Sequence, residues 1–236
     1  MYWSILFTKL IIVKYMKKFI ISIEGNIGVG KSSLLDKLRK DYINSADFIV
    51  EPVEEWLSIT NDEGKNILDV FYNDKKRWSY TFQNIAYITR MQKIIDVLLN
   101  SEKQFIIMDR SLDADLNTFA NLLHKDGCLD DIEWNAYNKW NNFFQEQYGN
   151  IFTHIYVYLK CDPNVSKERI LKRGREAEKN IDMDYLEKIS KCHDDWLINN
   201  NNNCDKSNII IIDVNKDFVS NEEHYKYILG RINNIV

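Results

Sequence analysis

The sequence predicts a three-layer, doubly wound α/β fold built on a five-stranded parallel sheet. Five short, continuous apolar runs recur along the chain, and each is followed by a polar turn, as expected for strands buried on both faces. Amphipathic helical patterns fill the intervals between these runs, as the crossovers between parallel strands require. The 236 residues contain no Pro/Gly-rich linker, so we expect one domain.

Strands and helices alternate along the chain. The apolar runs assigned to strands are Phe19–Ile23, Phe48–Val50, Phe105–Met108, His154–Leu159 and Ile209–Ile212. The helical patterns cover Lys31–Asn44, Trp78–Leu99, Ser111–Leu123, Asp130–Tyr148, Pro163–Arg173, Met183–Ile198 and Asn221–Ile232. Ligands of such folds bind beyond the carboxyl ends of the strands, so the residues that follow each strand are the candidates for a functional site.

Residues 1–17 lie outside this pattern and are expected to form an N-terminal extension of a domain that covers 18–236. The segment is apolar, but Lys9 and Lys14 interrupt it, which leaves too short a run for a membrane span of about 20 residues. It also lacks the Arg/Ser richness and the cleavage site of a targeting peptide. We expect translation to start at Met16, which mass spectrometry of the native N-terminus tests.

The charge balance and the cysteines limit the classes of partner. A net charge of -4, with acids and bases interspersed, gives no basic face for a nucleic-acid backbone, so small-molecule ligands are expected. The cysteines have no CxxC or metal-ligand spacing, which argues against a zinc site and a disulfide framework. They are Cys128, Cys161, Cys192 and Cys204. Reduced thiols favour a cytoplasmic location, and the unusual N-terminus leaves a mitochondrial one open.

The first strand leads directly into a phosphate-binding loop. The segment GNIGVGKS fits G-x-x-x-x-G-K-S, in which consecutive backbone N–H groups turn onto phosphate oxygens. Lys31 is expected to neutralise the β and γ phosphates, and the Ser32 hydroxyl to ligate Mg²⁺. A simple glycine-rich turn is the alternative, but the strand before and the amphipathic helix after favour a P-loop NTPase. The residues assigned to the ATP phosphates are Gly25, Asn26, Ile27, Gly28, Val29, Gly30, Lys31, Ser32 and Ser33.

Charged residues follow the second and third strands. Glu51 lies where a carboxylate can act as general base for an attacking hydroxyl, although a Glu before Pro is equally typical of a solvated turn. Asp109 lies where P-loop enzymes hold Mg²⁺, and the planar Arg110 could reach phosphate oxygens. A helix cap with a surface partner is the alternative for this pair, but the buried strand before it favours a functional role.

Three arginines surround a glycine at the end of a predicted helix: Arg169, Arg173 and Arg175. Basic residues at a helix C-terminus are favoured by the helix dipole alone. Their position before a polar stretch without apolar anchors instead predicts a lid that closes on the triphosphate and stabilises charge during transfer.

Seven motifs, in this order and at compatible spacing, resemble the deoxyribonucleoside kinases, with deoxycytidine, deoxyguanosine and deoxyadenosine kinases as the nearest members. They are IEGNIGVGKSSL, EPVEEW, RWSYTFQNIAYITR, DRSLDADLNTFA, DIEWNAYNKW, RGREAEKNIDMDYLEK and DVNKDF. The resemblance covers Lys18–Phe218. It implies transfer of the γ-phosphoryl of Mg·ATP to the 5′-hydroxyl of a deoxynucleoside in nucleotide salvage.

The resemblance also implies roles for individual residues. Glu51 would take the proton from the 5′-hydroxyl, and Arg110 would orient Glu51 and the phosphoryl group, with Lys31 as the third catalytic residue. Asp109 replaces the family's usual Glu and is one methylene shorter, which favours a water-mediated contact with Mg²⁺. Asp217 and Phe218 match the segment that passes over the donor base, and the choice among ATP, GTP and UTP stays open.

The resemblance also implies the contacts with the nucleoside. The Gln83 amide would read the base, and the Phe119 ring would stack on it. Trp56 and Phe71 would form aromatic walls, and Tyr72 with Glu178 would bind the sugar 3′-hydroxyl. One amide side chain donates and accepts in one plane, which suits base recognition. Crowding by the tyrosine would disfavour a ribose 2′-hydroxyl.

Base choice depends on Arg90 and Asp115. A charged pair at these positions accompanies cytosine or purine substrates in the family, so a purine deoxynucleoside or deoxycytidine is favoured over thymidine. A buried ion pair that serves only the fold is the alternative. Asp113 and Leu116 replace the Tyr and Arg common in the nearest relatives, which leaves the choice between purine and cytosine open.

Two other functions fit a phosphate loop. A nucleoside monophosphate kinase needs cations around the acceptor phosphate, whereas the residues expected there are Glu51, Tyr72 and Glu178. A regulatory GTPase needs a guanine-reading N-K-x-D, and the segment NKDF lacks the Asp in register. Both are therefore ranked below the deoxynucleoside kinase.

The resemblance implies a homodimer formed through two long helices, about Trp78–Leu99 and Asp130–Tyr148. The second of these is rich in aromatic residues. An aromatic stripe at helical spacing is more often part of a core than of an interface.

Overall fold

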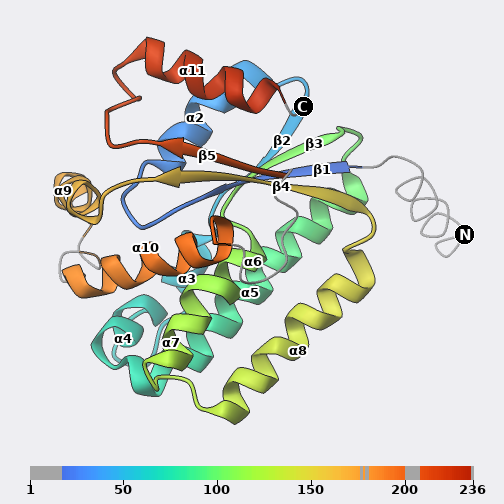
Figure 1. Ribbon diagram of the computed structural model, residues 1–236. Coiled ribbons are helices and arrows are strands. Elements are labelled where there is room, and N and C mark those ends of the chain that lie inside the picture. Colours follow the sequence, from blue (N-terminus) through green and yellow to red (C-terminus); the bar gives the residue numbers. More distant parts are fainter. Residues whose placement is uncertain (1–17, 176–177, 179–180, 200–207, 235–236) are drawn as a thin grey trace, which may run out of the picture.

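A five-stranded parallel sheet forms the centre of the computed structural model, which describes residues 18–175, 178, 181–199 and 208–234 (Figure 1). The strands are β1 (Lys18–Glu24), β2 (Ala46–Ile49), β3 (Phe105–Asp109), β4 (Phe152–Lys160) and β5 (Ile209–Asp213). Their order is β2-β3-β1-β4-β5, and every neighbouring pair is parallel. The predicted fold class is confirmed. The expected N-terminal extension and the start at Met16 lie outside the described residues.

The central position of β1 determines where a ligand can bind. The chain leaves β1 towards β3 and β2 on one side and later returns to β4 and β5 on the other, so the strand order reverses at β1. The crevice of such a sheet opens beyond the carboxyl ends of the strands at this reversal. The register places Ile23 beside Asp109 and Glu24 beside Tyr158. The loop after β1 therefore lies next to the end of β3.

Helices cover both faces of the sheet (Figure 1). On one face lie α2 (Lys31–Tyr42) and α11 (Glu222–Asn233), which contribute Leu34, Leu38 and Ile228 to one hydrophobic core. The other face is covered by α5 (Lys75–Asn100), α8 (Asp131–Tyr148) and α10 (Met183–Leu197), while α9 (Pro163–Arg173) lies beyond the end of β4. A second core joins the sheet to α5 and α8. Each face of the sheet is thus packed by its own hydrophobic core.

Two short helices differ from the sequence prediction, which left their residues unassigned. They are α3 (Val53–Ser58) and α4 (Ile67–Asn73). Six or seven residues are fewer than two helical turns, too few for an apolar period to stand out. Asn66 and Asp69 nevertheless form a capping box at the start of α4, a local signal that the sequence contains.

The helix expected over Ser111–Leu123 is present but is wound differently in its middle. It consists of α6 (Leu112–Ala114), the π-helical segment η1 (Asp115–Ala120) and α7 (Asn121–Lys125). In a π-helix about 4.4 residues make a turn, so Asp115 and Phe119 share one side. Both line the same pocket. Within the described residues, no helix is both long and apolar enough to cross a membrane.

Candidate active site

A cavity of about 450 Å³ lies at the carboxyl ends of β1, β2 and β3. It joins the loop after β1 with residues from α3, α4, α5, η1 and the segment after α9. Most of the predicted site residues line it: Ile27, Gly28, Lys31, Ser32, Glu51, Trp56, Phe71, Tyr72, Gln83, Arg90, Asp109, Arg110, Asp115, Phe119, Arg173, Arg175 and Glu178. The fold thus collects in one pocket residues that are far apart in the chain.

The loop between β1 and α2 has the backbone of a phosphate-binding loop. Gly28 has φ +83°, and a Cβ there would lie 2.5 Å from the carbonyl oxygen of Ser166. Asn26 fastens the loop to α10, because its Nδ2 donates to Leu186 O at 2.7 Å and to Ser190 Oγ at 2.8 Å. This anchoring role of Asn26 depends on α10, which the motif does not contain.

Lys31 lies folded over the loop. Its Nζ donates to the carbonyl oxygens of Gly25 (3.2 Å) and Asn26 (2.9 Å). Burial, followed by the neighbouring Arg110, lowers the pKa of Lys31 to about 7. Phosphate oxygens at the loop would replace these carbonyls as partners and favour the protonated amine.

Ser32 and Asp109 provide oxygen ligands of the kind that Mg²⁺ prefers. Ser32 Oγ donates to Asp109 Oδ2 at 3.0 Å, and Ser33 follows in the first turn of α2. Asp109 Oδ1 is buried and has no hydrogen-bond partner within the described residues. An unpartnered carboxylate oxygen at a phosphate loop fits a divalent cation.

Arg90 lies between two carboxylates in the wall of the pocket. Its Nη1 donates to Asp115 Oδ2 at 2.5 Å, and its Nη2 forms an ion pair with Glu51. Burial raises the pKa of Glu51, but Arg90, Arg110 and Lys31 outweigh it, so this pKa is below its ordinary value. Burial raises the pKa of Asp115 to about 6, against the influence of Arg90. Glu51 is therefore an ionised group of the pocket and not a solvated turn residue.

Aromatic rings and one amide form the rest of the wall. Phe71 and Phe82 pack at 4.6 Å between ring centroids, and Trp56 meets Phe82 edge-on. Gln83 is 2% exposed, and its Oε1 has no hydrogen-bond partner within the described part of the chain. The Arg110 guanidinium lies 4.4 Å from the centroid of the Phe119 ring. A buried acceptor beside aromatic faces suits a planar ligand with hydrogen-bonding edges.

His193 supports the Phe119 ring from behind. The two rings meet edge-on at 6.4 Å, and the His193 ring stacks on Tyr158 at 5.6 Å. Burial lowers the pKa of His193 to about 3, so the ring is neutral over the physiological range. Its role was not predicted, because a single His within a helical pattern gives no signal of what it will pack against.

Ion pairs connect the last residue of α9 with the residues that follow the helix. Arg173 forms an ion pair with Glu178, and Arg175 Nη1 lies 3.3 Å from Glu178 Oε1. Burial and Glu178 both raise the pKa of Tyr72. The sugar-binding pair implied by the resemblance, Tyr72 and Glu178, thus shares one side of the pocket with two of the predicted lid arginines.

Besides five residues of the phosphate loop and the start of α2 (Gly25, Asn26, Val29, Gly30 and Ser33), three predicted donor-site residues do not line the pocket. Arg169 donates to the carbonyl oxygens of Val29 (3.2 Å) and Val214 (2.8 Å), so its guanidinium is used to hold the phosphate loop to the segment after β5. Phe218 is 1% exposed and packs against Gly30. Asp217 caps its own turn, where Oδ1 accepts from the N–H two residues on. In this arrangement they are anchoring and packing residues.

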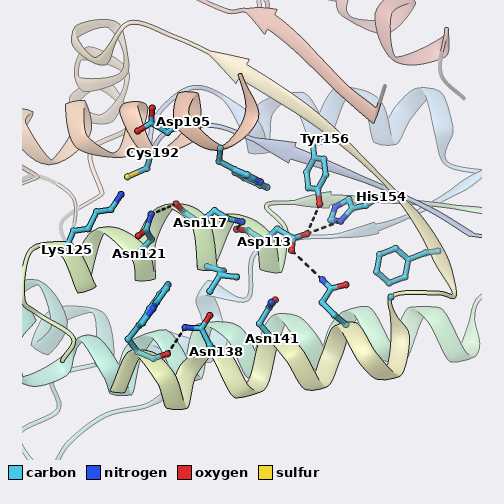
Figure 2. Close-up of a pocket in the computed structure, with 16 residues that line it drawn as sticks. Asp113, Asn117, Asn121, Lys125, Asn138, Asn141, His154, Tyr156, Cys192 and Asp195 are labelled. Carbon is cyan, nitrogen blue, oxygen red and sulfur yellow. Dashed lines mark hydrogen bonds and ion pairs between the residues drawn. The ribbon is translucent and has the colours of Figure 1, made fainter. Parts of the chain in front are cut away.

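A second, larger cavity of about 770 Å³ lies between α8 and α10 (Figure 2). Asp113 is at its centre, accepts from Tyr156 Oη at 2.7 Å and faces His154 Nδ1 at 3.3 Å. Asp113 and Leu116, two of the three departures from the family pattern, line this cavity and not the first. Lys125 is the one Lys or Arg among its described lining residues, so it has no cation cluster for a triphosphate.

The fold and the smaller cavity define a P-loop phosphotransferase for small molecules, because a phosphate loop opens there on an ionised carboxylate and an aromatic wall. The model of the deoxynucleoside kinase family matches residues 21–236, and the chain belongs to this family. It is therefore a deoxynucleoside kinase, a transferase that acts on small-molecule nucleosides with ATP as phosphate donor.

Individual relatives agree with this assignment. A probable deoxycytidine kinase of fowlpox virus (strain NVSL) is 38% identical over 212 residues, which cover 90% of this chain and 86% of the viral one. Deoxycytidine kinase of Homo sapiens is 32% identical over 220 residues, 84% of each chain. Mitochondrial deoxyguanosine kinase of Xenopus laevis is 30% identical over 221 residues, 85% of this chain and 83% of the relative.

The lowered pKa of His193 predicts a loss of stability in acid. Between the ordinary pKa of 6.5 and the folded value of about 3, the unfolded chain binds one proton more than the native chain. Stability then falls as the pH falls, and His193 contributes a loss of about 2 kcal/mol between pH 7 and pH 5. We expect His193→Gln to remove this part of the pH dependence in urea unfolding.

The parent protein, unfolded in the same buffers, is the reference. Equal slopes for the parent and His193→Gln would contradict the assignment of the acid loss to His193.

Proposed function

We propose that the protein transfers the γ-phosphoryl of ATP to the 5′-hydroxyl of a deoxynucleoside with an amino-bearing base, a purine or cytosine, in nucleotide salvage. The observation that carries this proposal is the position of ionised Glu51 in the same pocket as the phosphate loop and the Arg90–Asp115 pair. The domain over 18–236 is proposed as the unit that carries the activity.

Phosphoryl transfer depends on positioning and on charge neutralisation more than on covalent chemistry. Glu51 accepts the proton of the attacking hydroxyl, and Arg110 and Lys31 lie where the transferred group would pass. Ser32 and Asp109 would hold Mg²⁺, which supplies positive charge to the phosphates. Arg173 and Arg175 would complete the site as a lid.

The base preference follows from the acceptors in the wall. Adenine, guanine and cytosine carry an exocyclic amino group, and Asp115 and Gln83 Oε1 are acceptors that such a group can reach. Thymine has no exocyclic amino group and carries carbonyl groups and a methyl group on its ring instead. The relatives named deoxycytidine and deoxyguanosine kinase support a preference for amino-bearing bases.

A homodimer is proposed through α5 and α8. Tyr137 and Phe144 of α8 are buried in the core, whereas Ile132, Trp140 and Phe143 are 80%, 39% and 49% exposed. These three positions fall on one side of the helix by their spacing. An apolar face of this kind is typical of an interface.

The first expected outcome is turnover of nucleosides. With Mg·ATP as donor, we expect deoxycytidine or a purine deoxynucleoside to be phosphorylated at least about tenfold better in kcat/KM than thymidine, about 1.4 kcal/mol of discrimination. The assay includes the matching monophosphates. Turnover of monophosphates alone would overturn the proposed acceptor, and a preference for thymidine would overturn the role of Arg90 and Asp115.

The second concerns Glu51→Gln. The substitution keeps the size of the side chain but removes the proton acceptor, so kcat should fall by roughly 10²-fold or more while KM for the nucleoside changes little. Glu55→Gln is the matched control, because that carboxylate lies in α3, four residues after Glu51, and pairs with Lys93 outside the pocket. Parental turnover by Glu51→Gln would exclude this residue as the base.

The third concerns assembly. Light scattering at micromolar concentration should give twice the 28.1 kDa of one chain. Phe143→Glu places a charge on the proposed apolar face and should shift the protein to monomers. Glu146→Gln, on the same helix, is the control and should leave the mass unchanged. A monomeric parent would count against the dimer.

The cysteines support a reducing compartment. Cys128, Cys161 and Cys192 are all unpaired, as expected for a protein of the cytoplasm or the mitochondrial matrix. Recovery of the native protein from a secretory fraction would contradict this placement.

A further inference from the structure

Glu24 is a buried carboxylate to which neither the loop motif nor the pocket assigns a role. It is the last residue of β1, directly before the phosphate loop, and is 0% exposed. It does not line the nucleoside pocket. Burying a carboxylate is costly unless a partner compensates, so the interactions of Glu24 indicate what the residue is for.

The partner of Glu24 lies on the neighbouring strand end. Its Oε1 accepts the backbone N–H of Ser111 at 2.9 Å, and this hydrogen bond is buried. Ser111 follows Arg110 directly and caps α6 through its own Oγ, which accepts from Ala114 N at 3.0 Å. The carboxylate therefore holds the backbone at the point where β3 turns into the helix that carries Asp115.

Arg110 has the conformation that most needs such support. Its φ is +69°, and it is the single non-glycine residue with positive φ within the described ranges. A side chain with a Cβ is strained in this left-handed region and stays there only if its surroundings determine it. The strain falls on a residue whose guanidinium lines the pocket.

Three hydrogen bonds in succession tie this turn to the start of the phosphate loop. Arg110 N donates to Ile23 O at 3.1 Å, Ser111 N to Glu24 Oε1 at 2.9 Å, and Arg110 Nη2 to Gly25 O at 3.1 Å. The first and third use carbonyl groups that any residue would supply. The second is the one whose acceptor is a side chain, that of Glu24.

We propose that Glu24 is a positioning residue for phosphoryl transfer: its carboxylate holds the turn Asp109–Ser111 in the conformation that directs Arg110 toward the transferred group. Glu24 does not touch the nucleoside and acts through Arg110. The inference rests on the proposed function, since it assigns Arg110 to the transfer step. This role also gives a reason for a buried carboxylate directly before the phosphate loop. A negative charge there would otherwise be unfavourable, because it repels a bound phosphate.

Two substitutions separate the hydrogen bond from the charge. Glu24→Gln keeps an acceptor oxygen at the same reach but removes the charge, whereas Glu24→Asp keeps the charge but withdraws the acceptor by about 1.5 Å. If the hydrogen bond positions Arg110, Glu24→Gln keeps kcat within about 3-fold and Glu24→Asp loses about 10²-fold, with KM for the nucleoside nearly constant. The opposite order, or parental kcat in both variants, overturns the proposal.

A double substitution tests whether the effect passes through Arg110. In an Arg110→Ala background, Glu24→Asp should lower the remaining kcat by less than about 3-fold, because the group it positions is gone. A full further loss would show that Glu24 acts only on the fold and would overturn the proposal. Should Glu24→Asp not fold, Glu24→Met replaces it, since Met has similar length and no acceptor for the Ser111 N–H.

Ser22→Ala is the matched control. Ser22 lies two residues earlier on the same face of β1, is 0% exposed and shares a hydrogen bond with His154 Nε2 at 2.9 Å. Its loss should lower the melting temperature and leave kcat unchanged. A fall in kcat as large as that of Glu24→Asp would mean that any weakening of β1 impairs transfer, which overturns a specific role for Glu24.

The parent enzyme separates failure of this inference from failure of the proposed function. Turnover of deoxynucleosides by the parent tests the function. If the parent turns over none, the function is rejected, and the same Glu24 variants are compared in the hydrolysis of ATP by water. In that reaction, equal rates for Glu24→Gln and Glu24→Asp overturn the positioning role, and a selective loss in Glu24→Asp supports it.

Discussion

The parallel pairing of β1 with β3 is the constraint on which the site depends. It places the phosphate loop, which leaves β1, beside Asp109 and Arg110, which end β3. Since β1 and β3 are neighbours, no other strand separates the phosphate loop from Asp109 and Arg110. The crevice opens beside them because the strand order reverses at β1. The position of the phosphate loop beside Asp109 and Arg110 is therefore a consequence of strand register, and the helices packed on each face of the sheet help to keep that register.

Charge compensation is the second organising feature of the pocket. Lys31, Arg90 and Arg110 are buried within reach of Glu51, Asp109 and Asp115. Each cation makes the burial of the neighbouring carboxylates less costly, and each carboxylate does the same for the cations. Removing any one of them would leave an opposite charge uncompensated. The cations that a polyanionic substrate requires are thus compensated by carboxylates of the protein itself.

The nucleoside side of the pocket is built differently. Its wall comes from α3, α4, α5 and η1, which all lie on one face of the sheet. Asp115 and Phe119 lie four residues apart in the π-helical segment and line the same pocket, and His193 supports the Phe119 ring from α10. The proposed base recognition is consequently linked to packing between helices, whereas the proposed phosphate binding is linked to the sheet.

The sequence alone was enough to predict the sheet, the phosphate loop and the charged residues that follow the strands, because these depend on short-range signals: apolar runs, glycine spacing, and charges directly after strands. The residues on the nucleoside side of the pocket were implied by the resemblance to the deoxynucleoside kinases. Tertiary structure alone decided what Arg169, Phe218 and Asn26 do, because their partners come from segments distant in the chain. It also decided the short helices α3 and α4, which have too few residues for a period. For Glu24, the motif contained the residue, but only the register of β1 with β3 brought it to Ser111.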